Sequence, residues 1–219
     1  MNLWSDFLTN QGRPIHKWKH YFPVYERHFR DYVHKTVTFI EIGCGEGGSL
    51  EMWKRYFGPH AHIVGLDIDP RCKEFEEDQI DIRIGAQQDP EFLRSVVDEF
   101  GAPDIVLDDG SHVMSHVCAS FASLYPRLAK SGIYMVEDLH TAYWPEYEGG
   151  VGRPGSFIEL AKQLIDELNA DHIRDGLAPT EFTRTTLAMH FYDSAVVFER
   201  GRHTAKAAPK TGRSATIPA

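Results

Sequence analysis

The chain alternates between short apolar runs rich in β-branched residues and longer segments whose apolar residues recur at helical spacing. The apolar runs predict buried strands at 37–42, 62–67, 80–84, 105–108 and 133–136. The helical spacing predicts helices at 14–34 (with an aromatic face), 49–56, 90–100, 115–128 and 157–168. Because strands that alternate with helices pair in parallel through right-handed crossovers, the pattern indicates an α/β fold with a doubly wound, mostly parallel sheet.

The C-terminal part of the chain adds other elements. Segments 183–191 and 195–198, joined around Asp193, predict an antiparallel hairpin that brings the sheet to seven strands. Segment 141–156 is rich in glycine, proline and aromatic residues, which predicts a long loop over the carboxyl ends of the strands. We expect one domain at 1–200 with an N-terminal helical segment, and a disordered tail at 201–219 that has no acidic residue.

Charge and cysteine content restrict the class of protein. The chain has 23 Lys and Arg against 32 Asp and Glu, a net charge of −9, which disfavours nucleic acid and anionic membranes as partners. No apolar run approaches the ~20 residues of a membrane span. Three widely spaced cysteines exclude a disulfide framework, and the N-terminal residues do not have the apolar core of a signal peptide. These features predict a cytoplasmic protein.

A glycine-rich segment after the first predicted strand indicates a nucleoside-like cofactor. Gly43, Gly45 and Ser49 lie where a loop meets a helix N-terminus, and Asp67 ends the next strand, where its carboxylate can bind ribose hydroxyls. The glycines also match the dinucleotide fingerprint. Glu41 would repel a pyrophosphate, however, and suits the cationic amino-acid end of S-adenosylmethionine. An NAD(P)-dependent oxidoreductase and a non-catalytic protein of the same fold stay open as alternatives.

Three further residues complete the expected cofactor site. Gln87 follows the third strand, where the adenine should lie, and Asp108 ends the fourth strand. Tyr21 belongs to the aromatic face of the N-terminal helix.

Acidic and histidine side chains gather after the fourth and fifth predicted strands, at Asp108, Asp109, His112, Glu137, Asp138 and His140. Because parallel strands end at one edge of the sheet, we expect these side chains to meet beside the cofactor loop. Burying several carboxylates without a compensating charge is costly, and a divalent cation would remove that cost. Asp109, Glu137 and Asp138 form a hard oxygen set suited to Mg²⁺.

The histidines of this edge are candidates for proton transfer. His112 lies three residues after Asp109, within reach of a substrate beside the same ion, and imidazoles in general accept protons near neutral pH. His140 is open as a second base, a substrate contact or a packed residue, whereas His116 and His190 are expected to be structural. A Ser111–His112–Asp109 hydrolase triad is disfavoured, because the three lie on one turn without a G-x-S-x-G motif.

With these residues assembled, the chain resembles the class I S-adenosylmethionine-dependent sugar O-methyltransferases of the mycinamicin, rhamnosyl and methylmannose type, related to proteins labelled cephalosporin hydroxylases. The matching stretches span most of residues 17–200: 17–25, 40–49, 65–70, 107–112, 137–144 and 190–194. The pair Asp-Asp-Gly-Ser-His and Glu-Asp-Leu-His carries most of the specificity. In one departure, Ala86 stands where the family commonly has aspartate.

The resemblance implies a fold, a reaction and a set of roles. It implies Mg²⁺ on Asp109, Glu137 and Asp138, His112 as general base, and S-adenosylmethionine as methyl donor. The acceptor would be a sugar hydroxyl of a glycoside, and we expect a homodimer or higher homo-oligomer. In the loop after the fifth strand, one proline and three aromatic residues would pack on the sugar ring or, alternatively, on another subunit: Tyr143, Trp144, Pro145 and Tyr147.

Overall fold

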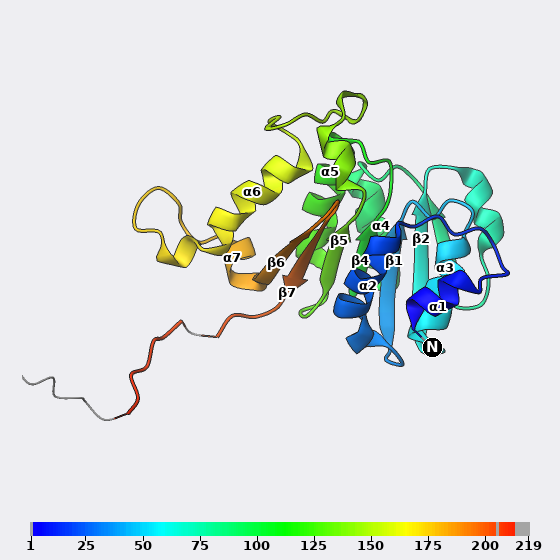
Figure 1. Ribbon diagram of the computed structural model, residues 1–219, viewed down its shortest axis with the longest axis horizontal. Helices are drawn as coiled ribbons and strands as arrows, with labels where there is room; N and C mark the ends of the chain where they lie inside the picture. The colour runs from blue at the N-terminus through cyan, green and yellow to red at the C-terminus, as the bar shows by residue number, and fades with distance from the viewer. Residues whose placement is uncertain (1, 205, 213–219) are drawn as a thin grey trace, which may run out of the picture.

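The computed structural model describes residues 2–204 and 206–212, and one seven-stranded sheet organises them (Figure 1). Its strands are β1 (Val37–Ile42), β2 (Ala61–Asp67), β3 (Ile80–Ile84), β4 (Ile105–Asp108), β5 (Ile133–Val136), β6 (Thr186–Tyr192) and β7 (Ala195–Arg200). The order is β3-β2-β1-β4-β5-β7-β6; the first five are parallel, and β7 is antiparallel to both β5 and β6. The predicted doubly wound α/β fold with a C-terminal hairpin is confirmed.

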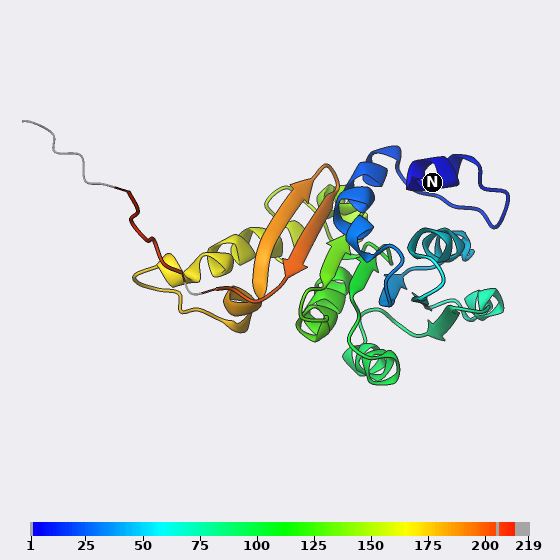
Figure 2. The same cartoon turned by 90° about the horizontal axis from the view of Figure 1, so that it is seen from below.

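Helices cover both faces of the sheet, as Figure 2 shows. The α-helices are α1 (Leu3–Leu8), α2 (Phe22–Phe29), α3 (Gly48–Phe57), α4 (Pro90–Phe100), α5 (Met114–Leu124), α6 (Phe157–Leu168) and α7 (Glu181–Thr185). The 3₁₀ turns are Lys19–Tyr21, Arg30–Tyr32, Pro70–Phe75, Tyr125–Arg127, Leu139–Tyr143, Pro145–Tyr147 and Ala170–His172. Helices α1–α3 pack on one face and α4–α6 on the other, each with its own hydrophobic cluster.

The central strands are buried on both faces, which explains their nearly continuous apolar sequences. In β1, Val37 and Phe39 join the cluster under α1–α3, while Ile40 and Ile42 join the cluster under α4–α6. Glu41 is the exception in this strand, a carboxylate with no exposed surface. A charge buried in the middle of the sheet needs a partner, and its partners lie in the candidate active site.

Three predicted elements differ from the structure. The helix predicted at 14–34 is the shorter α2 flanked by two 3₁₀ turns. The helix predicted at 115–128 ends at Leu124, because Pro126 cannot donate the backbone hydrogen bond that would continue it. The start of the segment predicted as a strand at 183–191 is α7, which the side chain of Thr180 caps by accepting a hydrogen bond from the Thr183 amide.

The C-terminal segment leaves the sheet after β7 (Figure 1). Its described residues, 201–204 and 206–212, form no helix or strand. Its first part contacts the body: the Gly201 amide donates to the Thr185 carbonyl over 2.7 Å, and Lys206 Nζ lies 2.6 Å from Asp171 Oδ2. Residues 205 and 213–219 of the tail that was expected to be disordered lie outside the described part. Among the described residues, no helix combines the length and apolarity needed to cross a membrane.

Candidate active site

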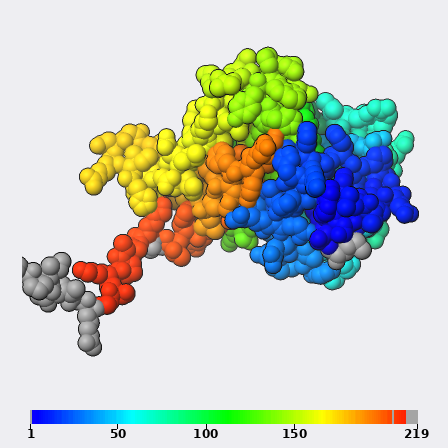
Figure 3. Space-filling model, viewed as in Figure 1, coloured from blue at the N-terminus to red at the C-terminus, as the bar shows by residue number. Residues whose placement is uncertain are grey.

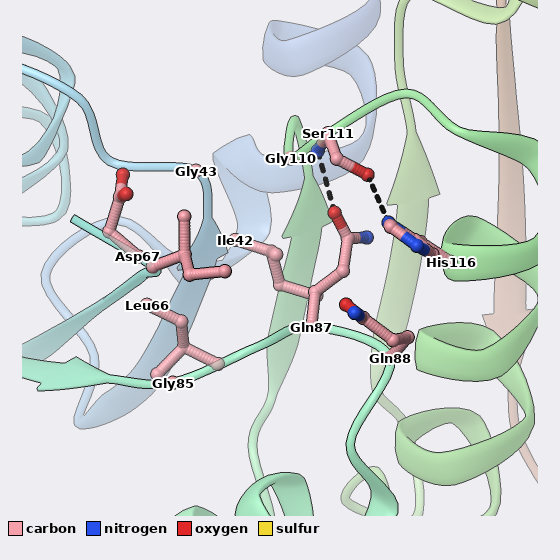
Figure 4. A pocket seen from close by; sticks show the side chains of 11 residues that line it. Ile42, Gly43, Leu66, Asp67, Gly85, Gln87, Gln88, Gly110, Ser111 and His116 are labelled. Atoms are coloured by element: carbon pink, nitrogen blue, oxygen red, sulfur yellow. Dashed lines mark hydrogen bonds between the residues drawn. The ribbon is translucent and has the colours of Figure 1, made fainter. Parts of the chain in front are cut away.

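A pocket of about 220 Å³ opens at the carboxyl ends of β1, β2 and β4 (Figure 4). It is lined by Ile42, Gly43, Leu66, Asp67, Ile68, Gly85, Gln87, Gln88, Gly110, Ser111 and His116. Gly43 has a left-handed φ of +83°, and a Cβ atom there would collide with the Asp109 carbonyl. Glycine at this position therefore lets the loops after β1 and β4 approach closely. His116, expected to be structural, lines this pocket with its Nδ1 2.9 Å from Ser111 Oγ.

Asp67 is fixed at the mouth of this pocket. Its Oδ2 accepts a hydrogen bond from the Gly45 amide over 3.0 Å, and its Oδ1 accepts one from the Asp69 amide over 2.9 Å. The glycine loop thus orients the carboxylate that the sequence places at the end of β2. The role of Asp67 toward a ribose stays a prediction.

Asp108 and Gln87, two other residues predicted to bind the cofactor, belong to a buried hydrogen-bond network. Asp108 accepts hydrogen bonds from Gln87 Nε2 (3.1 Å), the Tyr134 hydroxyl (3.1 Å) and the Ser120 hydroxyl. Burial raises the pKa of Asp108 although these donors oppose the shift. Gln87 Oε1 accepts from the Ser111 amide over 2.6 Å (Figure 4). Asp108 does not line the pocket, and Gln87 lines it with both ends of its amide engaged by the protein, so both brace the loop after β4.

Lys17 is the residue that sequence reasoning missed. Its ammonium lies 3.0 Å from Glu41 Oε1, 2.6 Å from Asp109 Oδ2 and 2.9 Å from Glu137 Oε1, and its side chain is 2% exposed. Burial lowers the pKa of Lys17, but the three carboxylates outweigh that effect and raise it well above its ordinary value. A permanent positive charge therefore joins the ends of β1, β4 and β5.

Glu41 and Ser49 contact each other below the glycine loop. Ser49 Oγ donates to Glu41 Oε2 over 2.7 Å, while the other oxygen of Glu41 faces Lys17. Both residues are buried. The predicted partner of Glu41 was a cationic cofactor group, and in this structure a lysine of the chain itself supplies the cation.

Helix α2 and the 3₁₀ turn before it bring two tyrosines to the acidic residues after β5. The Tyr25 hydroxyl donates to Glu137 Oε2 over 2.5 Å, and the Tyr21 hydroxyl donates to Asp138 Oδ1 over 2.7 Å. Burial raises the pKa of both tyrosines, so both stay neutral donors. Tyr21, predicted to bind the cofactor, is fully buried and holds Asp138 instead.

Asp109, His112 and Asp138 form the solvent-facing part of the acidic edge. Ligand atoms of all three lie within 4.8 Å of one another, and His112 Nε2 is 3.8 Å from both Asp109 Oδ1 and Asp138 Oδ2. His112 and Asp138 have left-handed φ angles of +58° and +56°, uncommon for residues other than glycine. Such backbone strain is often found at functional sites, where the surrounding structure maintains it.

Glu137 lies on the inner side of this edge, between Lys17 and Tyr25. Burial and then the charge of Asp109 raise the pKa of Glu137 well above its ordinary value. Burial also raises the pKa of Asp109 to about 6, although Lys17 opposes the shift. The structure therefore brings the three predicted metal ligands to one edge, with Asp109 between the inner Glu137 and the outer Asp138.

His140 occupies a separate position beside the same edge. Its Nδ1 is 2.6 Å from Ser194 Oγ and 4.0 Å from Asp138 Oδ1. The rings of Trp18 and Trp144 lie edge-on to its imidazole, with centroids 5.8 and 4.9 Å away. Tyr143 and Trp144, predicted to face a sugar or a subunit, are 50% and 43% exposed.

The loop after β4 connects the pocket and the acidic edge. Gly110 and Ser111 line the pocket, whereas Asp109 and His112, on either side of them, belong to the acidic cluster. A ligand in the pocket would therefore lie within one short loop of the carboxylates and the imidazole. The pocket and the acidic cluster therefore share one loop.

The seven-stranded fold is shared with solved methyltransferase structures. A comparison with models of protein families finds no match. Among curated proteins, the chain is 40% identical over 215 residues to mycinamicin VI 2''-O-methyltransferase of Micromonospora griseorubida, covering 91% of this chain and 53% of that protein. It is 38% identical over 212 residues to demethylmacrocin O-methyltransferase of Streptomyces fradiae, covering 91% and 52%.

A solved structure of a methyltransferase is also similar to this chain. MycE methyltransferase from the mycinamycin pathway, in complex with Mg, SAH and mycinamycin VI, superposes with a TM-score of 0.82 at 36% identity, covering 94% of this chain and 54% of that one. The chain is thus related to sugar O-methyltransferases, as its motifs indicated, and spans about half the length of the curated relatives it matches.

The ion cluster around Lys17 predicts a large effect on stability. Lys17→Met leaves Glu41, Asp109 and Glu137 buried without their cation, and breaking a buried ion pair costs about 3–5 kcal/mol. We expect the free energy of unfolding, measured by urea titration in chelator, to fall by that amount.

Lys54→Met is the matched control, because Lys54 pairs with Glu77 at the surface, where such a pair contributes about 0–1 kcal/mol. Equal losses for the two variants would mean that the Lys17 cluster contributes no more than a surface pair.

Proposed function

We propose that this protein transfers a methyl group from S-adenosylmethionine to a hydroxyl of a sugar in a glycosylated small molecule. The observation that carries the proposal is the loop after β4, which supplies Gly110 and Ser111 to the pocket and Asp109 and His112 to the acidic edge. The relatives named as O-methyltransferases, and the MycE structure with SAH and Mg, support the same reading.

The pocket has the features that a nucleoside cofactor requires. Ile42, Leu66 and Ile68 give it apolar walls for an adenine ring, and the fixed carboxylate of Asp67 can accept two ribose hydroxyls. The glycine loop 43–49 would lie along the amino-acid end, with Glu41 beneath it. Gln87 acts by positioning the Ser111 amide.

Magnesium fits the donors of the acidic edge. Three carboxylates, Glu41, Asp109 and Glu137, surround Lys17, and burial raises the pKa of Asp109 and of Glu137. Asp138 lies close to Asp109 at the outer side of the same edge. An additional positive charge would stabilise the ionised forms of these carboxylates. Asp109, Glu137 and Asp138 would hold the ion, and bound Mg²⁺ would lower the pKa of an acceptor hydroxyl.

His112 is the residue best placed to take the acceptor proton. Methyl transfer forms a bond between the hydroxyl oxygen and the methyl carbon and breaks the bond between that carbon and the sulfonium sulfur. The hydroxyl proton must leave, and neutral His112 Nε2 can accept it while Asp109 and Asp138, each 3.8 Å away, stabilise the imidazolium. His140 would contact the acceptor from the other side of Asp138.

The exposed aromatic residues beside His140 would bind the sugar. Aromatic faces pack well on the apolar faces of pyranose rings, and Trp144 and Tyr143 stand exposed next to the acidic edge. A homo-oligomer, a cytoplasmic location and a single domain at 1–200 remain predictions, as does the use of these rings at a subunit interface.

Cofactor choice separates the methyltransferase from the oxidoreductase alternative. Isothermal titration should show micromolar binding of S-adenosylhomocysteine and no comparable binding of NAD. Asp67→Ala should weaken S-adenosylhomocysteine binding by at least about 1.5 kcal/mol, because hydrogen bonds to a charged group contribute about that much. Asp81→Ala, a change in an exposed pair with His62, is the control. Binding of NAD alone would contradict the proposal.

Metal binding has a readout independent of any acceptor. Wild-type protein should bind Mg²⁺ in calorimetry, and Asp138→Asn should weaken that binding while S-adenosylhomocysteine affinity stays nearly unchanged, since Asp138 does not line the pocket. Asp193→Asn, an exposed aspartate on the β6–β7 turn, is the matched control. Equal Mg²⁺ affinity in Asp138→Asn and wild type would remove Asp138 from the metal site.

The general base can be identified from paired histidine variants. His112→Ala should lower kcat by about 10²–10⁴-fold, the usual contribution of a positioned base, with little change in cofactor affinity. His140→Ala should mainly raise KM for the acceptor, because His140 is held by Ser194 beside the exposed aromatic rings. A near-normal kcat for His112→Ala with a large loss for His140→Ala would reverse the assignment.

A further inference from the structure

A second cluster of metal-ligating side chains lies where α2 meets the C-terminal hairpin. His28 comes from α2, His190 from β6 and Glu199 from β7, and none of them belongs to the acidic edge described above. Figure 3 shows the N-terminal segment, in blue, adjoining the hairpin, in orange. The cluster therefore sits at the junction between the segment before β1 and the hairpin that completes the sheet.

Two imidazole nitrogens converge on one carboxylate oxygen. His28 Nδ1 lies 3.2 Å and His190 Nε2 lies 2.9 Å from Glu199 Oε1. The ligand atoms of the three residues all lie within 4.8 Å of one another, and the two imidazole centroids are 4.7 Å apart. Spacing of this kind lets all three groups coordinate one ion.

His190 Nε2 is the unexplained atom of this cluster. It is buried, and within the described part of the chain no partner satisfies the angular requirements of a hydrogen bond, although Glu199 Oε1 is 2.9 Å away. Because the angle between them is unsuitable for a hydrogen bond, the short distance from His190 Nε2 to Glu199 Oε1 does not stabilise an N–H donor there. The arrangement would be explained if the lone pairs of His28 Nδ1 and His190 Nε2 both pointed at one ion site beside the Glu199 carboxylate.

Tyr192 provides the outer contact that metal-binding histidines usually have. Its hydroxyl is 2.9 Å from His28 Nε2, so it can accept a hydrogen bond from Nε2–H and leave the lone pair on Nδ1, which faces Glu199. Hydrogen bonds of this kind fix the tautomer and the ring orientation of ligating histidines. Burial, and then the neighbouring His190, lower the pKa of His28, which favours the neutral form that binds metals.

We propose that His28, His190 and Glu199 bind a divalent transition-metal ion of the Zn²⁺ type. Two imidazoles with one carboxylate are a donor set that Zn²⁺ accepts and Mg²⁺ disfavours. The side chain of His28 is 2% exposed, whereas those of His190 and Glu199 are 26% and 34% exposed. Solvent can therefore reach the cluster from one side and provide a water as fourth ligand.

The ion would have a structural role. It would fasten α2 to β6 and β7. Helix α2 also carries Tyr25, which holds Glu137, and it directly follows Tyr21, which holds Asp138. Because Tyr25 and His28 are three residues apart on one helix, a metal at His28 would fix the helix that supports the acidic edge. The inference stands on these residues alone and does not depend on the reaction proposed above.

The test measures Zn²⁺ binding to the full chain after chelator treatment. Equilibrium dialysis with metal analysis should find one more equivalent of Zn²⁺ in wild type than in His190→Ala or Glu199→Gln. Tyr192→Phe should retain the site with about 10–100-fold weaker affinity. His62→Ala is the control, because His62 pairs with Asp81 at the surface and should not change the stoichiometry. Zn²⁺ bound at either of two other clusters would be present in wild type and in every variant, so it would not change the difference between them. These clusters are Asp109, His112 and Asp138, and Cys44, Asp67 and Cys72.

X-ray absorption at the zinc edge of wild-type protein is the second measurement, and it does not require any variant to fold. Two imidazole ligands with oxygen donors and no sulfur are expected for a single bound equivalent. A single imidazole would place the ion at the acidic edge, and sulfur ligands would place it at the cysteines; either result would overturn the proposal. Wild type that binds no Zn²⁺, or folded variants that bind as much as wild type, would also overturn it.

Discussion

The ammonium of Lys17, enclosed by the buried carboxylates of Glu41 and Glu137 and the half-buried carboxylate of Asp109, is the interaction on which the candidate site depends. Glu41 lies one residue before the end of β1, while Asp109 and Glu137 directly follow β4 and β5. Each is close enough to Lys17 for a charged hydrogen bond. Without that cation, three ionised groups at the end of a doubly buried sheet would repel one another in a medium of low dielectric constant. The lysine makes this acidic edge compatible with a folded protein.

This interaction also explains why the segment before β1 is part of the site. Lys17 comes from the chain between α1 and α2, and the same segment delivers Tyr21 and Tyr25 to Asp138 and Glu137. The five parallel strands alone would present carboxylates without a counter-ion or donors. The N-terminal segment therefore completes the acidic edge, and the hairpin β6–β7 adds Ser194 beside His140.

Local patterns in the sequence predicted most of the fold. Strands 80–84, 105–108 and 133–136 and helices 90–100 and 157–168 match the structure, because apolar runs and helical spacing report burial directly. The end of α7, residues 183–185, was predicted as part of a strand, and the β-branched Thr183, Thr185 and Thr186 are typical of one. Its Thr180 cap is a local contact that overrides that propensity.

The sequence allowed the location of the candidate site to be predicted, but not which side chains contact one another there. Strand ends brought Asp109, His112, Glu137 and Asp138 to one edge as expected. The cost of bare buried charge led to the expectation of a divalent cation, and in the structure the Lys17 ammonium lies among these carboxylates. The sequence could not show that Lys17 supplies a positive charge there, since its partners lie 24, 92 and 120 residues away. For the same reason, Asp108 and Tyr21 were expected to face a ligand, whereas the structure engages them with Ser120 and Asp138. Gln87 lines the pocket, but its amide is engaged by Asp108 and Ser111.

The most direct test of the account is transfer of an isotopically labelled methyl group from S-adenosylmethionine to a panel of glycosides, with Mg²⁺ present, followed by mass spectrometry. The account predicts one labelled methyl group on a sugar oxygen of at least one glycoside, and its loss in His112→Ala. Label that arrives only on nitrogen, on carbon or on the aglycone would contradict it.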